Sequence, residues 1–201
     1  MASPLNLDTK MKLPTDLPPA YGWLATVGPL PRTIQCALAL HGTQEVVGRG
    51  SNATIIGWRD ELNAAAPAGK PLVSGFSDDD IAWCGLFAAI VTYRRAGDIA
   101  EVVKSPLWAR NWAKYGVRAA KPGLGDVLVF ARGNGGHVGF YIAEDRATYH
   151  VLGGNQSNKV CITRIPKDRF LAARRPVYKN VPPSVKPYEV LTGGALSTNE
   201  A

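Results

Sequence analysis

The sequence predicts an α+β domain in which helices precede an antiparallel sheet. Apolar residues recur with helical spacing in the first half, and the second half holds short β-rich runs separated by glycine-rich or polar turns. Hydrophobic residues make up 46% of the 201 residues and charged residues 19%, a balance that provides a buried core and excludes wholesale disorder. Helices first and strands later are typical of the α+β class.

Two proline-containing segments flank the predicted domain. Residues 1–31 hold six prolines and few periodic apolar positions, so we expect an irregular N-terminal arm. Residues 177–201 contain further prolines, a Gly-Gly pair and a polar end, and they predict a C-terminal tail. Residues 32–176 remain as one domain of ordinary size.

The first two predicted helices have recognisable ends. The first stops at Gly42, because glycine readily ends a helix, and the second starts after Asn52, whose side chain can cap a helix N-terminus. Residues spaced three or four apart define one face of each: Ile34, Ala37, Leu38 and His41 in the first helix, and Ile55, Trp58 and Leu62 in the second.

The third predicted helix has the clearest pattern. It follows the run Asp78–Asp80, which we expect to cap it, and it stops at Gly97. Its periodic positions are Trp83, Leu86, Phe87, Ile90, Val91 and Arg94. A shorter fourth helix is expected around residues 108–114.

The period then changes to that of strands. We expect strands near residues 126–130, 137–142, 149–152 and 160–165, joined as hairpins through turn residues. Asp126 is interpreted as part of the turn into the first of these strands and not as a catalytic group.

Cys84 is the candidate nucleophile. It lies near the first turn of the third helix, where unpaired N–H groups and the helix dipole stabilise a thiolate and can hold a developing oxyanion. From its position alone, a small buried residue on an amphipathic helix is an equally good interpretation.

His137 is the candidate general base. It opens a predicted strand after a glycine-rich turn, and a cysteine nucleophile needs a base because a thiol with a pKa near 8.5 is mostly protonated at neutral pH. A third group should orient the imidazole through its other nitrogen. Asn155 and His150 on the next strand are the candidates.

The order of these motifs resembles a known family. Trp83-Cys84 on a helix is followed by Gly-Asp-Val-Leu-Val-Phe (125–130) and Gly-His-Val-Gly-Phe-Tyr (136–141), as in the papain-like cell-wall hydrolases of the NlpC and CHAP groups. The likeness covers roughly residues 32–176. The strings at 42–48, 151–156 and 174–176 are similar to a lysin-type (endolysin) subgroup common in phages and prophages.

The resemblance implies a papain-like fold and a cysteine amidase or endopeptidase that hydrolyses peptidoglycan without a metal or an organic cofactor. It makes Cys84 the nucleophile, His137 the general base and Asn155 the third residue. The NlpC pattern often has a histidine in the third role, and His150 lies at nearly that spacing; we prefer Asn155 because the Gly-Gly-Asn-Gln string matches the closer subgroup. Trp83, Glu45 and Asn52 are candidate substrate contacts.

The charge balance adds a second-order expectation. Lysine and arginine outnumber aspartate and glutamate 23 to 16, for a net charge of +7. An anionic glycopeptide or lipid layer would suit this excess, and a solvated basic face is the alternative. No nucleic-acid motif accompanies the charge, so we expect no nucleic-acid partner. The basic residues cluster late in the domain: Arg164, Lys167, Arg169, Arg174 and Arg175.

Two rival functions stay open at this point. One is an acyltransferase or an amidase on a non-wall substrate with the same three residues, and the other is a silent wall-binding or virion structural module. We expect a monomer. No apolar run is long enough to span a membrane. The first residues lack the apolar region of a signal peptide, so we expect synthesis in the cytoplasm. Delivery to the wall would then need a holin, injection or a virion.

Overall fold

The computed structural model describes residues 12–191 and Leu196, and it confirms the α+β class. The α-helices are α1 (Arg32–Leu38), α2 (Ala53–Ala65) and α3 (Cys84–Ala96), and the 3₁₀ helices are η1 (Pro19–Ala25), η2 (Ile99–Glu101), η3 (Ala109–Lys114) and η4 (Lys167–Arg169). The strands are β1 (Val117–Arg118), β2 (Val127–Arg132), β3 (Gly135–Glu144), β4 (Thr148–Gln156), β5 (Lys159–Pro166) and β6 (Phe170–Arg175).

All six strands form one antiparallel sheet in the order β1-β6-β2-β3-β4-β5. The four predicted strands correspond to β2 through β5, which follow one another as hairpins. The structure adds β6, which inserts between β1 and β2. Its sequence, Phe-Leu-Ala-Ala-Arg-Arg, is poor in β-branched residues, so local propensity gave no sign of a strand there.

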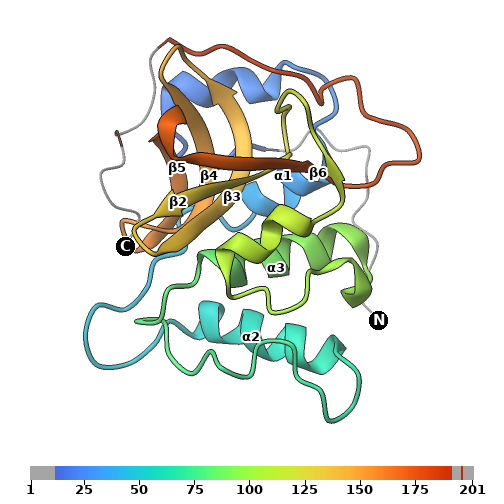
Figure 1. Cartoon of the computed structure of the whole chain (residues 1–201). Helices are drawn as coiled ribbons and strands as arrows, with labels where there is room; N and C mark the ends of the chain where they lie inside the picture. The colour runs from blue at the N-terminus through green and yellow to red at the C-terminus, as the bar shows by residue number, and fades with distance from the viewer. Residues whose placement is uncertain (1–11, 192–195, 197–201) are drawn as a thin grey trace.

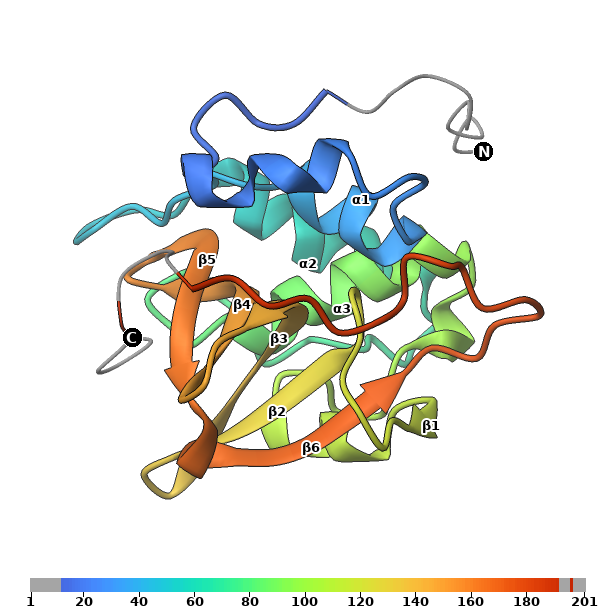
Figure 2. The same ribbon diagram turned by 90° about the horizontal axis from the view of Figure 1, so that it is seen from above.

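The three α-helices lie together on one side of the sheet, as Figure 2 shows, and α3 is the helix that contacts β3 and β4. The helices α1 and α2 both pack on α3, one on either side of it in Figure 1. The residues predicted to form the apolar stripe of α3 are fully buried, among them Leu86, Phe87 and Ile90. Because strand side chains alternate, the opposite face of the sheet carries a second, smaller cluster around Phe130 and Tyr141.

Two helix ends agree with the sequence, and two of the predicted helices differ from it. Asn52 caps α2 by accepting a hydrogen bond from the Thr54 N–H, and Gly97 ends α3 in the left-handed conformation with φ of 71°. The predicted first helix is shorter than expected, because α1 ends at Leu38 and turns lead on to Gly42. The fourth predicted helix is the 3₁₀ helix η3.

The expected cap of α3 by Asp78–Asp80 was wrong. Trp83 is the N-cap residue, and no side chain caps the helix. Asp79 instead accepts hydrogen bonds from the N–H groups of Val46 and Asn52, at 3.1 and 2.8 Å. Asp79 therefore fastens the preceding loop near the start of α3, and the aspartates do not cap the helix itself.

The described parts of both flanking segments pack onto the body. Tyr21 and Leu24 of the N-terminal arm are buried in the main core. The C-terminal segment crosses the molecule from β6 towards β5 (Figure 2), and its Ser184 hydroxyl donates to the carbonyl of Pro29 at 2.6 Å. The rings of Trp23 and Tyr188 stack with centroids 4.7 Å apart. The two arms thus contact each other as well as the domain that they flank.

The late basic residues are bonded within the chain. Lys167 pairs with Glu144, and Arg164 pairs with Asp145. Three arginines bond as follows: Arg175 to the Asp126 carboxylate, Arg174 to the carbonyls of Tyr115 and Gly116, and Arg169 to the carbonyl of Ala131. These side chains hold strands and turns together. Binding of an anionic partner by this cluster stays a prediction. In the described part of the chain, no helix has the length and apolar character needed to cross a membrane.

Candidate active site

Cys84 is the first residue of α3 and is 3% exposed. The first hydrogen bond within the helix runs from the Phe87 N–H to the carbonyl of Trp83, so the N–H groups before Phe87 point out of the helix start. That end of the helix carries positive partial charge, which favours a thiolate over a thiol and favours an oxyanion beside it. The placement expected from the sequence is therefore the one the structure shows.

Gly85 explains how the chain can pack so tightly beside Cys84. A Cβ at this position would lie 2.8 Å from the carbonyl oxygen of Leu107 and would also collide with the carbonyl of Pro106. The segment between η2 and η3 therefore runs directly against the first turn of α3.

His137 lies near the start of β3, opposite Phe130 of β2, and its side chain is fully buried. Its Nε2 is 3.0 Å from Oε1 of Gln156. The amide nitrogen of Gln156 donates to the carbonyls of Val151 and Cys161, at 3.1 and 2.5 Å, and these two acceptors fix which way the amide points. Since an oxygen faces the ring, Nε2 must carry the proton, and the neutral imidazole has Nδ1 as its acceptor nitrogen.

Gln156, the residue after Asn155, contacts the imidazole. The role of Asn155 as the third residue stays a prediction. Asn155 is buried with φ of 55°, a left-handed backbone, and the register between β4 and β5 shifts between Gly153 and Gln156. This irregularity places Gln156 against His137, and regular strand alternation in the sequence gives no sign of it.

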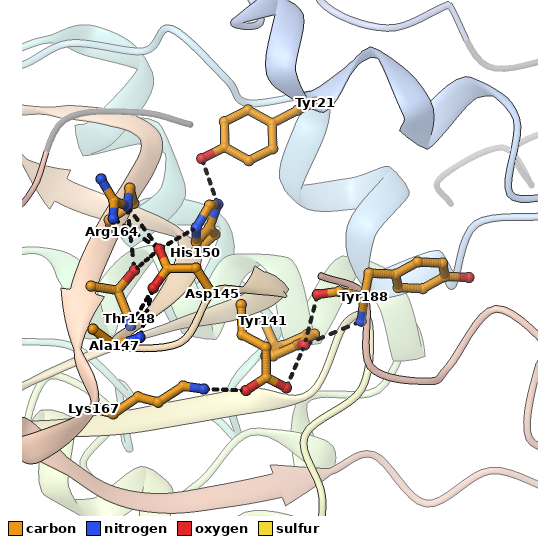
Figure 3. A network of polar contacts seen from close by, with 10 residues as sticks. Tyr21, Tyr141, Asp145, Ala147, Thr148, His150, Arg164, Lys167 and Tyr188 are labelled. Atoms are coloured by element: carbon orange, nitrogen blue, oxygen red, sulfur yellow. Dashed lines mark hydrogen bonds and ion pairs between the residues drawn. The ribbon is translucent and has the colours of Figure 1, made fainter. Parts of the chain in front are cut away.

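His150, the other candidate for the third role, belongs to a different network. It pairs with Ala143, six residues along β3 from His137, which is about 20 Å at the rise of a strand. Figure 3 shows it between Tyr21, whose hydroxyl donates to Nδ1 at 3.0 Å, and Asp145, which accepts from Nε2 at 3.2 Å. The structure does not bring His150 to His137.

The network around His150 has its own electrostatics. Burial lowers the pKa of His150, and Asp145 opposes that shift in part. For Asp145, burial acts to raise the pKa, but hydrogen bonds from Thr148, the Ala147 N–H and His150 outweigh it, so this pKa lies below its ordinary value. The network joins the N-terminal arm to the turn between β3 and β4, and it serves stability.

Two segments link the surroundings of Cys84 to those of His137. The first is the glycine pair of β4: a Cβ at Gly153 would lie 3.1 Å from Nε2 of His137, and a Cβ at Gly154 would lie 2.7 Å from the ring of Trp83. Adjacent residues of β4 thus contact the histidine and the residue before the cysteine. Only glycines allow this approach of strand to helix.

The second segment runs from Pro106 to Arg110. It touches Gly85 at one end, as described above, and at the other end a Cβ at Gly136 would lie 3.0 Å from Cγ of Arg110. Arg110 also donates to the carbonyl of Gly135 at 2.7 Å. The residues next to Cys84 and His137 are therefore held by the same stretch of chain, and the two side chains share one region of the fold.

The three predicted substrate contacts lie near α3 but form structural bonds. Trp83 is fully buried, and its indole N–H donates to Glu45 at 2.8 Å. Asn52 caps α2 and donates from its side chain to the carbonyl of Gln44 at 2.7 Å. These bonds fasten the loop at residues 44–52 beside the start of α3. A direct role of the three residues in substrate binding stays a prediction.

The remaining acidic residues and cysteines have structural surroundings that explain their positions. Asp126 is buried, accepts from the Gly123 N–H and pairs with Arg175, as expected of a turn residue. Burial raises the pKa of the thiols of Cys36 and Cys161. Among the described residues, the carboxylates of Asp78–Asp80 gather within 4.8 Å of one another and could accept a cation, but the hydrogen bonds to Asp79 already explain its place.

A helix that begins at a cysteine, packed on an antiparallel sheet that carries a buried histidine, is the arrangement of papain-like cysteine hydrolases. In the comparison with protein families, residues 76–155 match the CHAP domain. This match contains Cys84, His137 and the β4 glycine pair, and it agrees with the resemblance to the CHAP and NlpC groups seen in the motifs. No curated protein matches the chain, and no solved structure matches it either. A CHAP domain indicates a cysteine- and histidine-dependent amidase or peptidase that acts on peptidoglycan.

Proposed function

We propose that this protein hydrolyses an amide bond of peptidoglycan, either within the stem peptide or at the muramoyl–alanine link, with Cys84 as nucleophile and His137 as general base. The observation that carries the proposal is the bond between His137 Nε2 and Gln156, which leaves Nδ1 as the basic nitrogen of the ring. The match to the CHAP domain gives the substrate class.

The mechanism is acyl transfer to sulfur followed by hydrolysis. His137 Nδ1 takes the Cys84 thiol proton, and the thiolate attacks the amide carbonyl carbon. The N–H groups at the start of α3 stabilise the oxyanion of the tetrahedral intermediate. The protonated Nδ1 then donates to the departing amine as the C–N bond breaks. Water, activated by Nδ1, hydrolyses the thioester, releases the carboxylate product and restores the thiol.

Gln156 takes the positioning role first assigned to Asn155. Its Oε1 accepts the Nε2 proton, so it holds the ring in the tautomer that has Nδ1 basic. An amide in this position stabilises the imidazolium less than a carboxylate would, because it brings a dipole and not a full charge. Asn155 acts through its backbone: its left-handed conformation lies at the register shift directly before Gln156 and so helps to set the position of Gln156.

The biological setting proposed here is bacterial lysis by a phage-type lysin. The support is the set of strings at residues 42–48, 151–156 and 174–176 that resemble that subgroup. Expression with a periplasmic export signal tests it: lysis by the wild type, and none by the Cys84→Ala variant, is the expected result. Wild-type cleavage of isolated walls without lysis of cells would contradict the lysin role alone.

The decisive experiment incubates purified Gram-negative peptidoglycan with the wild type, with Cys84→Ala and with Cys161→Ala, a control that removes a thiol outside the proposed dyad. Mass spectrometry of the soluble products identifies the new ends and so the bond that is cut. We expect release by the wild type and none by Cys84→Ala. Equal release by the wild type and Cys84→Ala would overturn the assignment of the nucleophile. No release by folded wild type, together with transfer to an added amine, would favour the acyltransferase.

A further inference from the structure

A pocket of about 340 Å³ lies beside the segment that packs on the start of α3. It is lined by Val103, Lys104, Ser105, Asn111 and Lys114. Two of these five residues are lysines and none is acidic, so the pocket offers positive charge and polar donors to a ligand. Its volume lies at the lower end of the range of small-ligand pockets.

The two lysines of the pocket form no ion pair with a carboxylate of the described residues. Both Lys104 and Lys114 are exposed. The acidic residue nearest to Lys104 along the chain, Glu101, is held by Arg95 at 2.9 Å. These lysines thus differ from the late basic residues, which are bonded to acceptors of the chain itself.

The wall of the pocket is held in place before any ligand arrives. The Asn111 amide donates to the carbonyl of Ser105 at 3.0 Å, and the Trp112 indole N–H donates to the carbonyl of Pro106 at 2.9 Å. Ser105 has φ of 51°, an uncommon left-handed conformation for a serine. A site that is fixed in this way loses little conformational entropy when it binds.

The pocket is tied to the proposed catalytic residues by the chain itself. Ser105 directly precedes Pro106, whose carbonyl packs on Gly85 beside Cys84. At the other end, Arg110 lies against Gly136 beside His137 and directly precedes Asn111. Figure 1 shows η3, which carries Asn111 and Lys114, in front of α3. The pocket is therefore built on both ends of the segment that contacts the neighbours of Cys84 and His137.

We propose that the pocket binds a free carboxylate of the peptidoglycan stem peptide while the scissile amide lies at Cys84. The inference rests on the proposed function and adds to it a substrate class, stem peptides with a free carboxylate near the cut. Two ammonium groups and the Ser105 hydroxyl can donate to one carboxylate, and charge-assisted hydrogen bonds of this kind are stronger than neutral ones. A substrate whose carboxylate is amidated loses that attraction.

The test uses two muropeptides that differ only at the glutamate α-carboxyl, free in one and amidated in the other. The double variant Lys104→Gln/Lys114→Gln is compared with Lys70→Gln/Lys121→Gln, which removes the same charge at exposed sites outside the pocket. We expect the wild type and the control to prefer the free carboxylate about tenfold in kcat/KM, mainly through KM, and the pocket variant to lose the preference. Equal kcat/KM for both muropeptides with the wild type would overturn the inference.

A binding measurement separates this inference from the proposed function. Both muropeptides, and inorganic phosphate as a plain anion, are titrated into the Cys84→Ala variant while amide shifts of residues 103–114 are followed by NMR. Tighter binding of the free carboxylate form supports the pocket even if the wild type cleaves nothing, in which case only the proposed function fails. Cleavage without any preference in binding overturns the pocket alone. Phosphate binding as tight as that of the free-carboxylate muropeptide would also overturn it, since the site would then recognise only charge.

Discussion

Oε1 of Gln156 lies 3.0 Å from Nε2 of His137, and the amide that carries this oxygen is fixed by the carbonyls of Val151 and Cys161. The relationship joins β3, β4 and β5 at one buried point. It selects the tautomer of His137 from β4, a strand that carries neither Cys84 nor His137. The tautomer of His137 is thereby linked to the pairing of β4 with β5.

Substitution of Gln156 should separate a positioning role from a merely structural one. We expect Gln156→Ala to lower kcat by about 10- to 100-fold with little change in KM, since a residue that orients a ligating or catalytic histidine typically has an effect of this size. Gln156→Glu should restore part of the activity. A carboxylate stabilises the imidazolium, raises the pKa of His137, and so moves the acidic limb of the kcat/KM profile to higher pH. An unchanged pH profile in Gln156→Glu would argue against the role, and Asn155→Ala is the neighbouring control.

The contact between Gly154 and α3 should not tolerate a side chain. A Cβ there would lie 2.5 Å from Cβ of Phe87 and 2.7 Å from the Trp83 ring, so helix and strand must move apart. We expect Gly154→Ala to destabilise the fold by about 1–3 kcal/mol and to reduce activity. Gly57→Ala is the matched control, because Gly57 lies in α2 with nothing within 4 Å, and it should be neutral or stabilising by up to about 1 kcal/mol. Urea unfolding measures both, and equal stability of the two variants would contradict the expectation.

Stability should fall as the pH drops below about 6.5. Burial lowers the pKa of His150 below its ordinary 6.5, so the folded protein binds a proton there less readily than the unfolded chain. Its contribution is present above pH 6.5 and is lost as the pH falls towards the lowered pKa. The lowered pKa of Asp145 acts in the same direction at still lower pH, below its ordinary 3.8. Urea unfolding at pH 7.5 and 5.5 measures the loss, and His150→Gln should reduce the difference between the two. A steeper dependence in that variant would refute the assignment.

The bond between Trp83 and Glu45 should be measurable as an anchor of the loop at residues 44–52. Trp83→Phe keeps a buried ring but removes the N–H that donates to Glu45, and we expect a loss of about 1 kcal/mol in unfolding free energy. Glu45→Gln keeps an acceptor oxygen and should have the smaller effect. If both variants matched the wild type in stability and changed only KM, Trp83 and Glu45 would be substrate contacts after all.

The parts of the fold that the sequence predicts are those with a strong local signal. The stripe of α3, the Asn52 cap and the Gly97 stop all rest on contacts within a few residues, and each is confirmed. The strand β6 was missed because its pairing with β1 and β2 is decided by tertiary contacts and not by its own composition. The aspartates before α3 were expected to act locally as a helix cap, and one of them, Asp79, instead bonds to a loop more than 25 residues away.

The sequence predicts the positions of Cys84 and His137 in the fold but not the contact of His137 with Gln156. A cysteine at a helix start and a histidine near a strand start are visible in sequence, and the structure has both residues at those positions. Gln156 was not found, because the left-handed Asn155 shifts the register by an amount that regular alternation cannot anticipate. In the sequence, Gln156 is visible only as the residue after the expected Asn155. Its contact with His137 follows from the orientation of its amide, which the carbonyls of Val151 and Cys161 fix.

The contact between Ser184 and Pro29 has a practical consequence for where the chain can be cut. A fragment limited to residues 76–155, the part that matches the CHAP domain, would hold both Cys84 and His137. It would lack Gln156, the Cys161 carbonyl that fixes its amide, and the helices α1 and α2 that cover α3. The part that matches the CHAP domain is therefore shorter than the part that these contacts hold together, so an expression fragment should include both Pro29 and Ser184.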